Sequence, residues 1–122
     1  MITYQRENID NNKHITDMLA FIRGNYQKDI GIHDIAQSVG LSYSHVRRIF
    51  SEEMNTSILA YLNDIRINEA KKYLSQTNMA IKEISTKVGY NNEQSFNRYF
   101  KKSTGITPGD WRRRKLSESK ED

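Results

Sequence analysis

The side chains best suited to chemistry are hydrogen-bonding groups that recur in two similar segments. The first segment, YSHVRRIFSEE over residues 43–53, carries serine and arginine, and the second, NEQSFNRYFKKS over residues 92–103, carries arginine, asparagine and glutamine. An α-helix fits the major groove of B-DNA, where arginine can form two hydrogen bonds with guanine and asparagine or glutamine can form two with adenine. The residue types therefore indicate helices that contact bases, although either segment alone could equally be a solvated helix surface.

Helical periodicity sorts each segment into an apolar face and a polar face. At about 100° per residue, the apolar residues of each segment fall on one side and must point inward. The inward residues are Val46, Ile49 and Phe50 in the first segment and Phe96, Tyr99 and Phe100 in the second. The outward residues are Ser44, Arg47, Arg48 and Ser51 in the first segment and Gln94, Asn97, Arg98 and Lys101 in the second. The two polar faces therefore coincide position for position.

The surroundings of these segments match as well, so the chain contains an internal repeat. Residues 34–62, DIAQSVGLSYSHVRRIFSEEMNTSILAYL, align with residues 83–111, EISTKVGYNNEQSFNRYFKKSTGITPGDW, after the insertion of one residue. Gly40 and Gly89 align, and glycine supplies the positive φ that a sharp turn after a short helix requires. A repeat of fixed period indicates repeated supersecondary units. The pattern predicts two helix-turn-helix units.

Further helices would position these two units. Residues 10–25 have apolar side chains at steps of three and four, which predicts an amphipathic helix that covers the first unit. Residues 58–75 also read as a helix, but its apolar face changes sides midway. The apolar residues of this helix are Ile58, Tyr61, Leu62 and Ile65, followed by Ile67, Ala70 and Leu74. A helix with two apolar faces can pack on two cores, so we expect it to connect the units.

Capping residues predict where several helices begin. The candidate N-caps are Ser42, then Thr56 or Ser57, and Asn91, which with Gln94 resembles a capping box. The last helix would begin after Thr107, with Pro108 at the first helical position and Trp111 anchoring it to the second core.

These elements predict an all-α fold that is divided into five consecutive parts. We expect a flexible N-terminal segment at residues 1–11, a first helix-turn-helix subdomain at 12–56 and a connector helix at 57–75. A second helix-turn-helix subdomain would follow at 76–116, and a disordered tail at 117–122.

Composition and charge favour a polyanionic partner and argue against catalysis. Nineteen Lys and Arg against fifteen Asp and Glu give a net charge of +4, and the excess of basic residues lies in residues 41–122, with both units. The chain has no cysteine, which excludes disulfides, thiolate metal sites and cysteine nucleophiles. The three histidines, His14, His33 and His45, fall on different elements. We therefore predict no enzymatic activity, no cofactor and no metal site.

Four motifs follow one another over roughly residues 12–115: DIAQSVGLSYSHVRRIF, RINEAKKYL, EISTKVGYNNEQSFNRYF and KKSTGITPGDWR. In this order and at this spacing they resemble the DNA-binding domain of the AraC/XylS family of bacterial transcription regulators. The resemblance implies seven helices in two helix-turn-helix subdomains joined by a long helix. It also implies that two recognition helices enter successive segments of the major groove.

The resemblance assigns candidate DNA contacts by motif position. The first recognition helix would present Ser44, Arg47 and Arg48 to bases, with His45 near a phosphate. The second would present Gln94, Asn97 and Arg98, with Glu93 at its N-terminal edge. Ser51 and Lys101 complete the candidate DNA-binding residues. Glu93 departs from the expected chemistry, because a carboxylate could accept from a cytosine amino group or could repel phosphate and cap the helix.

The expected partner is promoter or operator double-stranded DNA, with RNA polymerase as a second partner if the protein is an activator. No apolar run is long enough for a membrane span or a signal peptide, so we expect a cytoplasmic, nucleoid-associated protein without membrane contact. An effector-binding or dimerisation domain is expected to be absent from this chain. It would then be a small stand-alone regulator or the C-terminal domain of a larger sugar-responsive or two-component regulator.

Two alternatives remain open from the sequence. The chain could be a helical protein-interaction module that retains the helix-turn-helix scaffold without reading bases. Residues 112–115, RRRK, could bind phosphate or could complement the macrodipole at a helix C-terminus.

Overall fold

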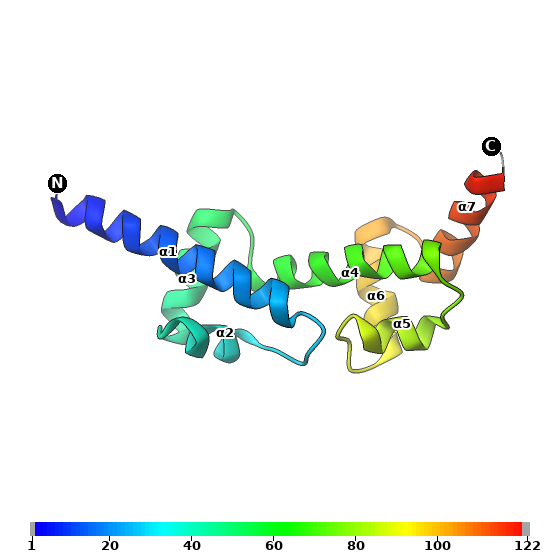
Figure 1. The fold of residues 1–122 in the computed structure, drawn as a ribbon, viewed down its shortest axis with the longest axis horizontal. Coiled ribbons are helices and arrows are strands. Elements are labelled where there is room, and N and C mark those ends of the chain that lie inside the picture. Colours follow the sequence, from blue (N-terminus) through cyan, green and yellow to red (C-terminus); the bar gives the residue numbers. More distant parts are fainter. Residues whose placement is uncertain (1, 121–122) are drawn as a thin grey trace. The chain divides into compact units, whose positions relative to one another are not determined.

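The computed structural model describes the backbone of residues 2–120 and the side chains of residues 10–118. Over the described backbone the chain forms seven α-helices and no β-strand (Figure 1). The helices are α1 (Ile2–Asn25), α2 (Ile32–Val39), α3 (Tyr43–Met54), α4 (Ile58–Gln76), α5 (Ile81–Lys87), α6 (Glu93–Thr104) and α7 (Pro108–Lys120). The prediction of an all-α fold with seven helices is therefore confirmed. Within residues 2–120, no helix is both long enough and apolar enough to cross a membrane.

The chain divides into two compact units, which we describe separately. Unit 1 consists of the chain as far as Tyr26 together with Ile30–Leu62, and unit 2 consists of Gln27–Asp29 together with the chain from Asn63 onward. The boundary between Leu62 and Asn63 lies inside α4, so the two halves of this helix belong to different units. This division agrees with the predicted change of apolar face along the connector.

Unit 1 encloses its own hydrophobic core, to which four helices contribute. Helix α1 contacts both α2 and α3, as expected for a helix that covers the first helix-turn-helix. The buried apolar residues of the unit are Ile15, Met18 and Ile22 from α1, Ile35 and Ala36 from α2, Val46, Ile49 and Phe50 from α3, and Ile58 and Leu62 from α4. The residues predicted to point inward from α3 are therefore all buried.

Unit 2 encloses a second core with the same plan. Its buried residues are Ile67, Ala70 and Leu74 from α4, Ile84, Val88 and Tyr90 from α5 and the turn, and Phe96 and Phe100 from α6. Tyr99 and Trp111 are partly buried and pack against this core, which confirms the anchoring role predicted for the tryptophan. The second half of α4 thus covers the second helix-turn-helix.

The repeat extends into the helix that follows each of α3 and α6. In unit 1 the rings of Phe50 and Tyr61 meet edge to face, with centroids 5.5 Å apart and an interplanar angle of 68°. In unit 2 the rings of Phe100 and Trp111 meet in the same way, at 6.2 Å and 85°. Edge-to-face pairs are a favoured aromatic geometry. Each unit therefore fixes the end of α3 or α6 against the next helix with an aromatic pair.

Turn geometry explains how the second helix of each unit is aimed. Gly40 and Gly89 both have positive φ, 69° and 109°, where a side chain would be strained. After α3 and α6 the chain reverses at Asn55 (φ 56°) and Gly105 (φ 85°). Asparagine tolerates the left-handed region better than other residues with a side chain. The two units therefore use equivalent left-handed positions at both ends.

Most of the predicted helix caps are present. Ser42 Oγ accepts a hydrogen bond from the His45 amide at 3.1 Å. Ser57 Oγ accepts from the Ala60 amide at 3.1 Å, which identifies Ser57 rather than Thr56 as the cap of α4. These hydroxyls satisfy amides that have no partner inside the helix.

The cap of α6 differs by one residue from the prediction. Asn92, not Asn91, is the N-cap, because its Oδ1 accepts from the Ser95 amide at 2.7 Å. The reciprocal contact expected from Gln94 does not arise, since Gln94 then occupies the second helical position and its side chain is exposed. The longer turn in unit 2 contains two adjacent asparagines, and residue spacing alone did not show which of them is the N-cap.

The terminal helices are longer than predicted. We expected a flexible segment over residues 1–11, but α1 begins at Ile2. The tail was expected to be disordered from Ser117, but α7 continues to Lys120, and residues 121–122 lie outside the described residues. Both extensions lack glycine and proline, and extending an existing helix costs far less than nucleating a new one.

Candidate nucleic-acid interface

Helices α3 and α6 are equivalent elements of the two units. Both are 12 residues long, and both begin after an N-cap side chain and end at a left-handed residue. Each buries one apolar face, on Val46, Ile49 and Phe50 or on Phe96 and Phe100. The opposite faces are free to present polar side chains to a partner.

On α3 the structure brings the predicted basic and hydroxyl residues together on one side. Ser44, Arg47, Arg48 and Ser51 are all exposed. His45 is half-buried, and its backbone amide is held by Ser42. The exposed face of α3 therefore presents two guanidinium groups flanked by two hydroxyls, which are donors suited to base edges and phosphates.

The two arginines of this face are held by different neighbours. The guanidinium carbon of Arg47 lies 5.7 Å from the centroid of the Tyr43 ring. Arg48 Nη1 lies 3.6 Å from Glu52 Oε2, in a pair whose side chains are 53% and 57% exposed. Each partner lies one helical turn away on α3: Tyr43 precedes Arg47 by four residues, and Glu52 follows Arg48 by four residues. Arg47 thus has an aromatic contact and Arg48 an ionic one.

On α6 the predicted residues are divided between full and partial exposure. Gln94, Arg98 and Lys101 are exposed, whereas Glu93 and Asn97 are half-buried. The guanidinium carbon of Arg98 lies 5.5 Å from the centroid of the Tyr99 ring. Asn97 Oδ1 is buried and has no hydrogen-bond partner among the described residues. Asn97 was predicted to point outward, but its side chain is only partly exposed and lies at the edge of the polar face.

Neither Tyr43 nor Glu52 was among the predicted site residues, although both contact an arginine of α3. The signal in the sequence was the four-residue spacing of Tyr43 from Arg47 and of Arg48 from Glu52. A hollow beside this face is lined by Ile32, Arg47, Arg48, Ser51, Ser57, Ile58 and Leu59. The concave surface next to the arginines is therefore built by α2, α3 and the start of α4.

The basic run after Trp111 is largely engaged inside unit 2. Arg112 Nε donates to the Leu74 carbonyl at 3.0 Å, near the C-terminal end of α4. Lys115 Nζ lies 3.3 Å from Glu118 Oε2 and 5.1 Å from the centroid of the Trp111 ring. These contacts favour a structural role for Arg112 and Lys115. The Arg112 contact is made with a carbonyl near the C-terminal end of α4, whereas residues 112–115 themselves lie inside α7 and not at its C-terminus.

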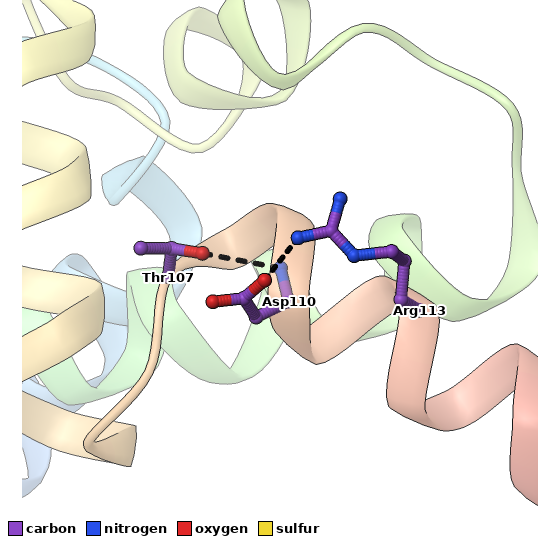
Figure 2. A network of polar contacts seen from close by, with 3 residues as sticks. All are labelled: Thr107, Asp110 and Arg113. Atoms are coloured by element: carbon purple, nitrogen blue, oxygen red, sulfur yellow. Dashed lines mark hydrogen bonds and ion pairs between the residues drawn. The ribbon is translucent and has the colours of Figure 1, made fainter.

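Figure 2 shows the contacts of Arg113, a further residue of this basic run, in the first turns of α7. Thr107 Oγ1 accepts a hydrogen bond from the Asp110 amide at 3.1 Å, so Thr107 is the predicted cap. Arg113 donates to the Asp110 carboxylate, and this hydrogen bond, with one from Thr107, lowers the pKa of Asp110 below its ordinary value. Arg113 is therefore paired with a carboxylate on its own helix.

The described residues offer no group of three or more His, Asp or Glu side chains that could hold a metal ion. The chemistry available at the exposed faces of α3 and α6 is hydrogen bonding and charge. Arginine, glutamine, lysine and serine side chains can donate to bases and phosphates without a covalent step. The arrangement is suited to binding a polyanion rather than to catalysis.

Comparisons with known proteins agree with this arrangement. A family model described as a helix-turn-helix domain matches residues 35–114. The HTH-type transcriptional activator AarP of Providencia stuartii is 32% identical over 112 residues, which cover 91% of this chain and 83% of AarP. An uncharacterized HTH-type transcriptional regulator of Bacillus subtilis, YtdP, is 36% identical over 106 residues, which cover 86% of this chain.

The chain spans only part of the length of several relatives. It covers 14% of YtdP, and 36% and 32% of two other curated relatives that regulate operons. Among solved structures, it is similar to the C-terminal domain of AraT, a response regulator from Geobacillus stearothermophilus, with a TM-score of 0.80 and 27% identity. That likeness covers 82% of this chain and 84% of the AraT chain.

Proposed function

Because the chain belongs to the AraC/XylS family of helix-turn-helix transcription regulators, we propose that it binds double-stranded DNA at specific sequences through α3 and α6. The family consists of transcription regulators and not of enzymes. The observation that carries the proposal is the pair of matched helices, each buried on one face and exposing arginine on the other. Two such faces in one chain match the chemistry of the major groove.

The mechanism is direct base reading supported by phosphate contacts. Arg48 and Arg98 occupy equivalent positions on α3 and α6, and each would donate two hydrogen bonds to a guanine. Arg47 and Gln94, which are also exposed, would read neighbouring bases. Ser44 would contribute a further hydroxyl to a base on the α3 side. Base contacts supply sequence preference, because phosphates are the same at every position.

Other side chains of the two faces would set affinity and register. Ser51 and Lys101, which are exposed, and the half-buried His45 would contact phosphates, which position the protein without reading sequence. Glu93 would accept from a cytosine amino group at the N-terminal edge of α6. Asn97 would contact the DNA only through its amide nitrogen, because its Oδ1 is buried.

The wider partners of the protein follow from the family. We propose that the natural target is promoter or operator DNA in the bacterial nucleoid, and that RNA polymerase is a partner if the complete protein activates transcription. The chain covers 36% or less of the length of three relatives, and no effector-binding or dimerisation role is proposed for the described residues.

Selection of binding sites from random duplex DNA with this 122-residue chain tests the proposal. We expect enrichment of an asymmetric motif with two separate boxes, one for each recognition helix. A single box would contradict base reading by one of the two units. No enrichment, with steep salt dependence on every duplex, would contradict sequence-specific binding and leave only charge attraction.

Glu52→Gln should increase the affinity for DNA. The carboxylate of Glu52 forms an ion pair with Arg48 and would lie close to the phosphates of bound DNA. Because this pair is exposed, it contributes little to the stability of the fold. Removing it should tighten binding to the selected duplex by up to about fivefold at low salt. Fluorescence anisotropy with a labelled duplex gives the Kd values.

Glu53→Gln is the matched control. Glu53 is exposed and adjacent to Glu52, and its substitution removes the same charge. If both variants tighten binding equally, the effect comes from net charge and not from release of Arg48. An unchanged affinity in Glu52→Gln would show that Arg48 leaves Glu52 at no cost.

A further inference from the structure

We infer that Tyr43 is a specificity-determining residue that holds the Arg47 side chain in place for base reading. The inference rests on the proposed function, because it assigns to Tyr43 a role in sequence reading by α3. Tyr43 is not itself required to contact DNA. It acts as a positioning residue through the guanidinium group of Arg47.

The first observation is that Tyr43 is an aromatic side chain that the core does not use. It is the first residue of α3 and is 38% exposed, whereas the other aromatic residues of α3, α4 and α6 are buried or partly buried. Its ring makes contacts on two elements. The ring centroid lies 4.7 Å from that of His33 on α2, and 5.7 Å from the guanidinium carbon of Arg47 on α3. The exposed ring therefore links the two helices of the turn to a candidate base reader.

The second observation is the way in which Tyr43 contacts the arginine. A cation within about 6 Å of a ring centroid, over the ring, is attracted to the face of the π-system. The ring accepts no strong hydrogen bond, so the N–H donors at the edge of the guanidinium group remain free for a base. Arg48 differs, because its partner Glu52 is a carboxylate that competes for the same donors. Tyr43 restricts Arg47 without blocking it.

This restriction has a physical consequence for recognition. Arginine has several rotatable bonds, and ordering them at an interface opposes binding unless the side chain is already held. A guanidinium group that is held in advance also favours one orientation of its two parallel donors. Discrimination at the base pair read by Arg47 should therefore depend on the Tyr43 ring.

Unit 2 lacks this arrangement. The residues of α6 equivalent to Tyr43 and Arg47 are Glu93 and Asn97, and both are half-buried. Asn97 is short and its Oδ1 is already buried, so it needs no aromatic neighbour to restrict it. The Tyr43–Arg47 contact is therefore specific to the first recognition helix, whereas in α6 the guanidinium carbon of Arg98 lies 5.5 Å from the ring centroid of the adjacent Tyr99.

The experiment is a set of affinities for the selected duplex and for duplexes changed at one base pair at a time. The proteins are the parental chain, Tyr43→Leu, Tyr43→Phe, Arg47→Ala and the double variant Tyr43→Leu with Arg47→Ala. We expect Tyr43→Leu to weaken binding about two- to fivefold and to relax preference at the base pair that Arg47→Ala relaxes. Tyr43→Phe should keep both affinity and preference, because it retains the ring.

The double variant separates a positioning role from an independent one. If Tyr43 acts through Arg47, adding Tyr43→Leu to Arg47→Ala should cause no further loss. Additive losses, a relaxed preference at another base pair, or no effect of Tyr43→Leu would overturn the inference while leaving sequence-specific binding intact. If the parental chain prefers no sequence, both the proposed function and the inference are overturned.

A second variant guards against a change in folding. Circular dichroism melts compare Tyr43→Leu with the parental chain, and His33→Ala removes the support of the ring from α2 without altering α3. We expect His33→Ala to relax preference at the same base pair by a smaller factor. A relaxed preference in neither variant, at unchanged melting temperature, would show that the ring has no role in reading sequence.

Discussion

Phe100→Ala should destabilise unit 2 by about 3 to 5 kcal/mol, the range for removing a large aromatic side chain from a packed core. Phe100 has no exposed surface and lies in the core of unit 2. Its ring meets Phe96 at a centroid distance of 5.7 Å and Trp111 at 6.2 Å. Alanine would leave a cavity beneath α6 and would remove the aromatic contact that fixes α7.

Denaturant unfolding read by tryptophan fluorescence measures this effect, because Trp111 is the only tryptophan and lies in unit 2. Phe100→Leu is the control and should lose much less, since it keeps most of the apolar volume. Phe50→Ala is the matched variant of unit 1, where the same contact is made with Tyr61. A loss below about 1 kcal/mol for Phe100→Ala would contradict the packing of the second core.

Arg98→Ala should weaken binding to the selected duplex by about 1 to 3 kcal/mol and relax preference at one base pair. Arg98 is exposed on α6, at the position equivalent to Arg48 on α3. Losing both donors of a guanine contact affects only the correct base, so binding to a scrambled duplex should weaken far less. Anisotropy titrations with the two duplexes at fixed salt measure the difference.

Lys102→Ala is the control for Arg98→Ala, because Lys102 is exposed on the same helix and carries the same charge but is outside the predicted face. It should change affinity slightly, and by the same factor for both duplexes. If Arg98→Ala also weakens both duplexes by one common factor, Arg98 contacts phosphate and does not read a base.

The sequence predicted the scaffold well because the scaffold depends on local chemistry. The period of apolar residues separates the buried residues Val46 and Phe96 from the exposed residues Arg48 and Arg98. Positive φ at Gly89 and the hydroxyl cap at Ser42 are properties of single residues in known turn geometries. Such features need no knowledge of distant contacts, so the two helix-turn-helix units could be read directly.

Features that depend on contacts between distant parts of the chain were not predicted. Arg66 is buried in unit 2, donates to the Lys28 carbonyl at 2.9 Å, and lies 5.4 Å from the centroid of the Tyr90 ring. Burial lowers the pKa of Arg66 and raises that of Tyr90, whose hydroxyl donates to Asn63 Oδ1 at 2.8 Å. A charged residue on a helix reads as solvated unless its partners are known.

The exposure of the candidate site residues was predicted correctly at the centre of each polar face and less well at its edges. The residues at the centre of each polar face are exposed as expected, but Asn97 is turned partly inward and Glu93 is half-buried. A helical wheel gives the direction in which each side chain leaves the helix. It does not show how far neighbouring side chains cover it, which decides the exposure of residues near the edge of a face. Tyr43 was not among the predicted site residues: its contact with His33 joins α2 and α3, and its contact with Arg47 lies within α3 at a four-residue spacing.

Whether this chain reads DNA sequence is decided by a comparison of two dissociation constants. The duplex obtained by selection and a scrambled duplex of the same length and composition are titrated with the parental chain at about 0.15 M salt. We expect the selected duplex to bind about a thousandfold or more tightly. Equal affinity for the two duplexes, with the same steep salt dependence, would contradict the claim and reduce the interaction to charge alone.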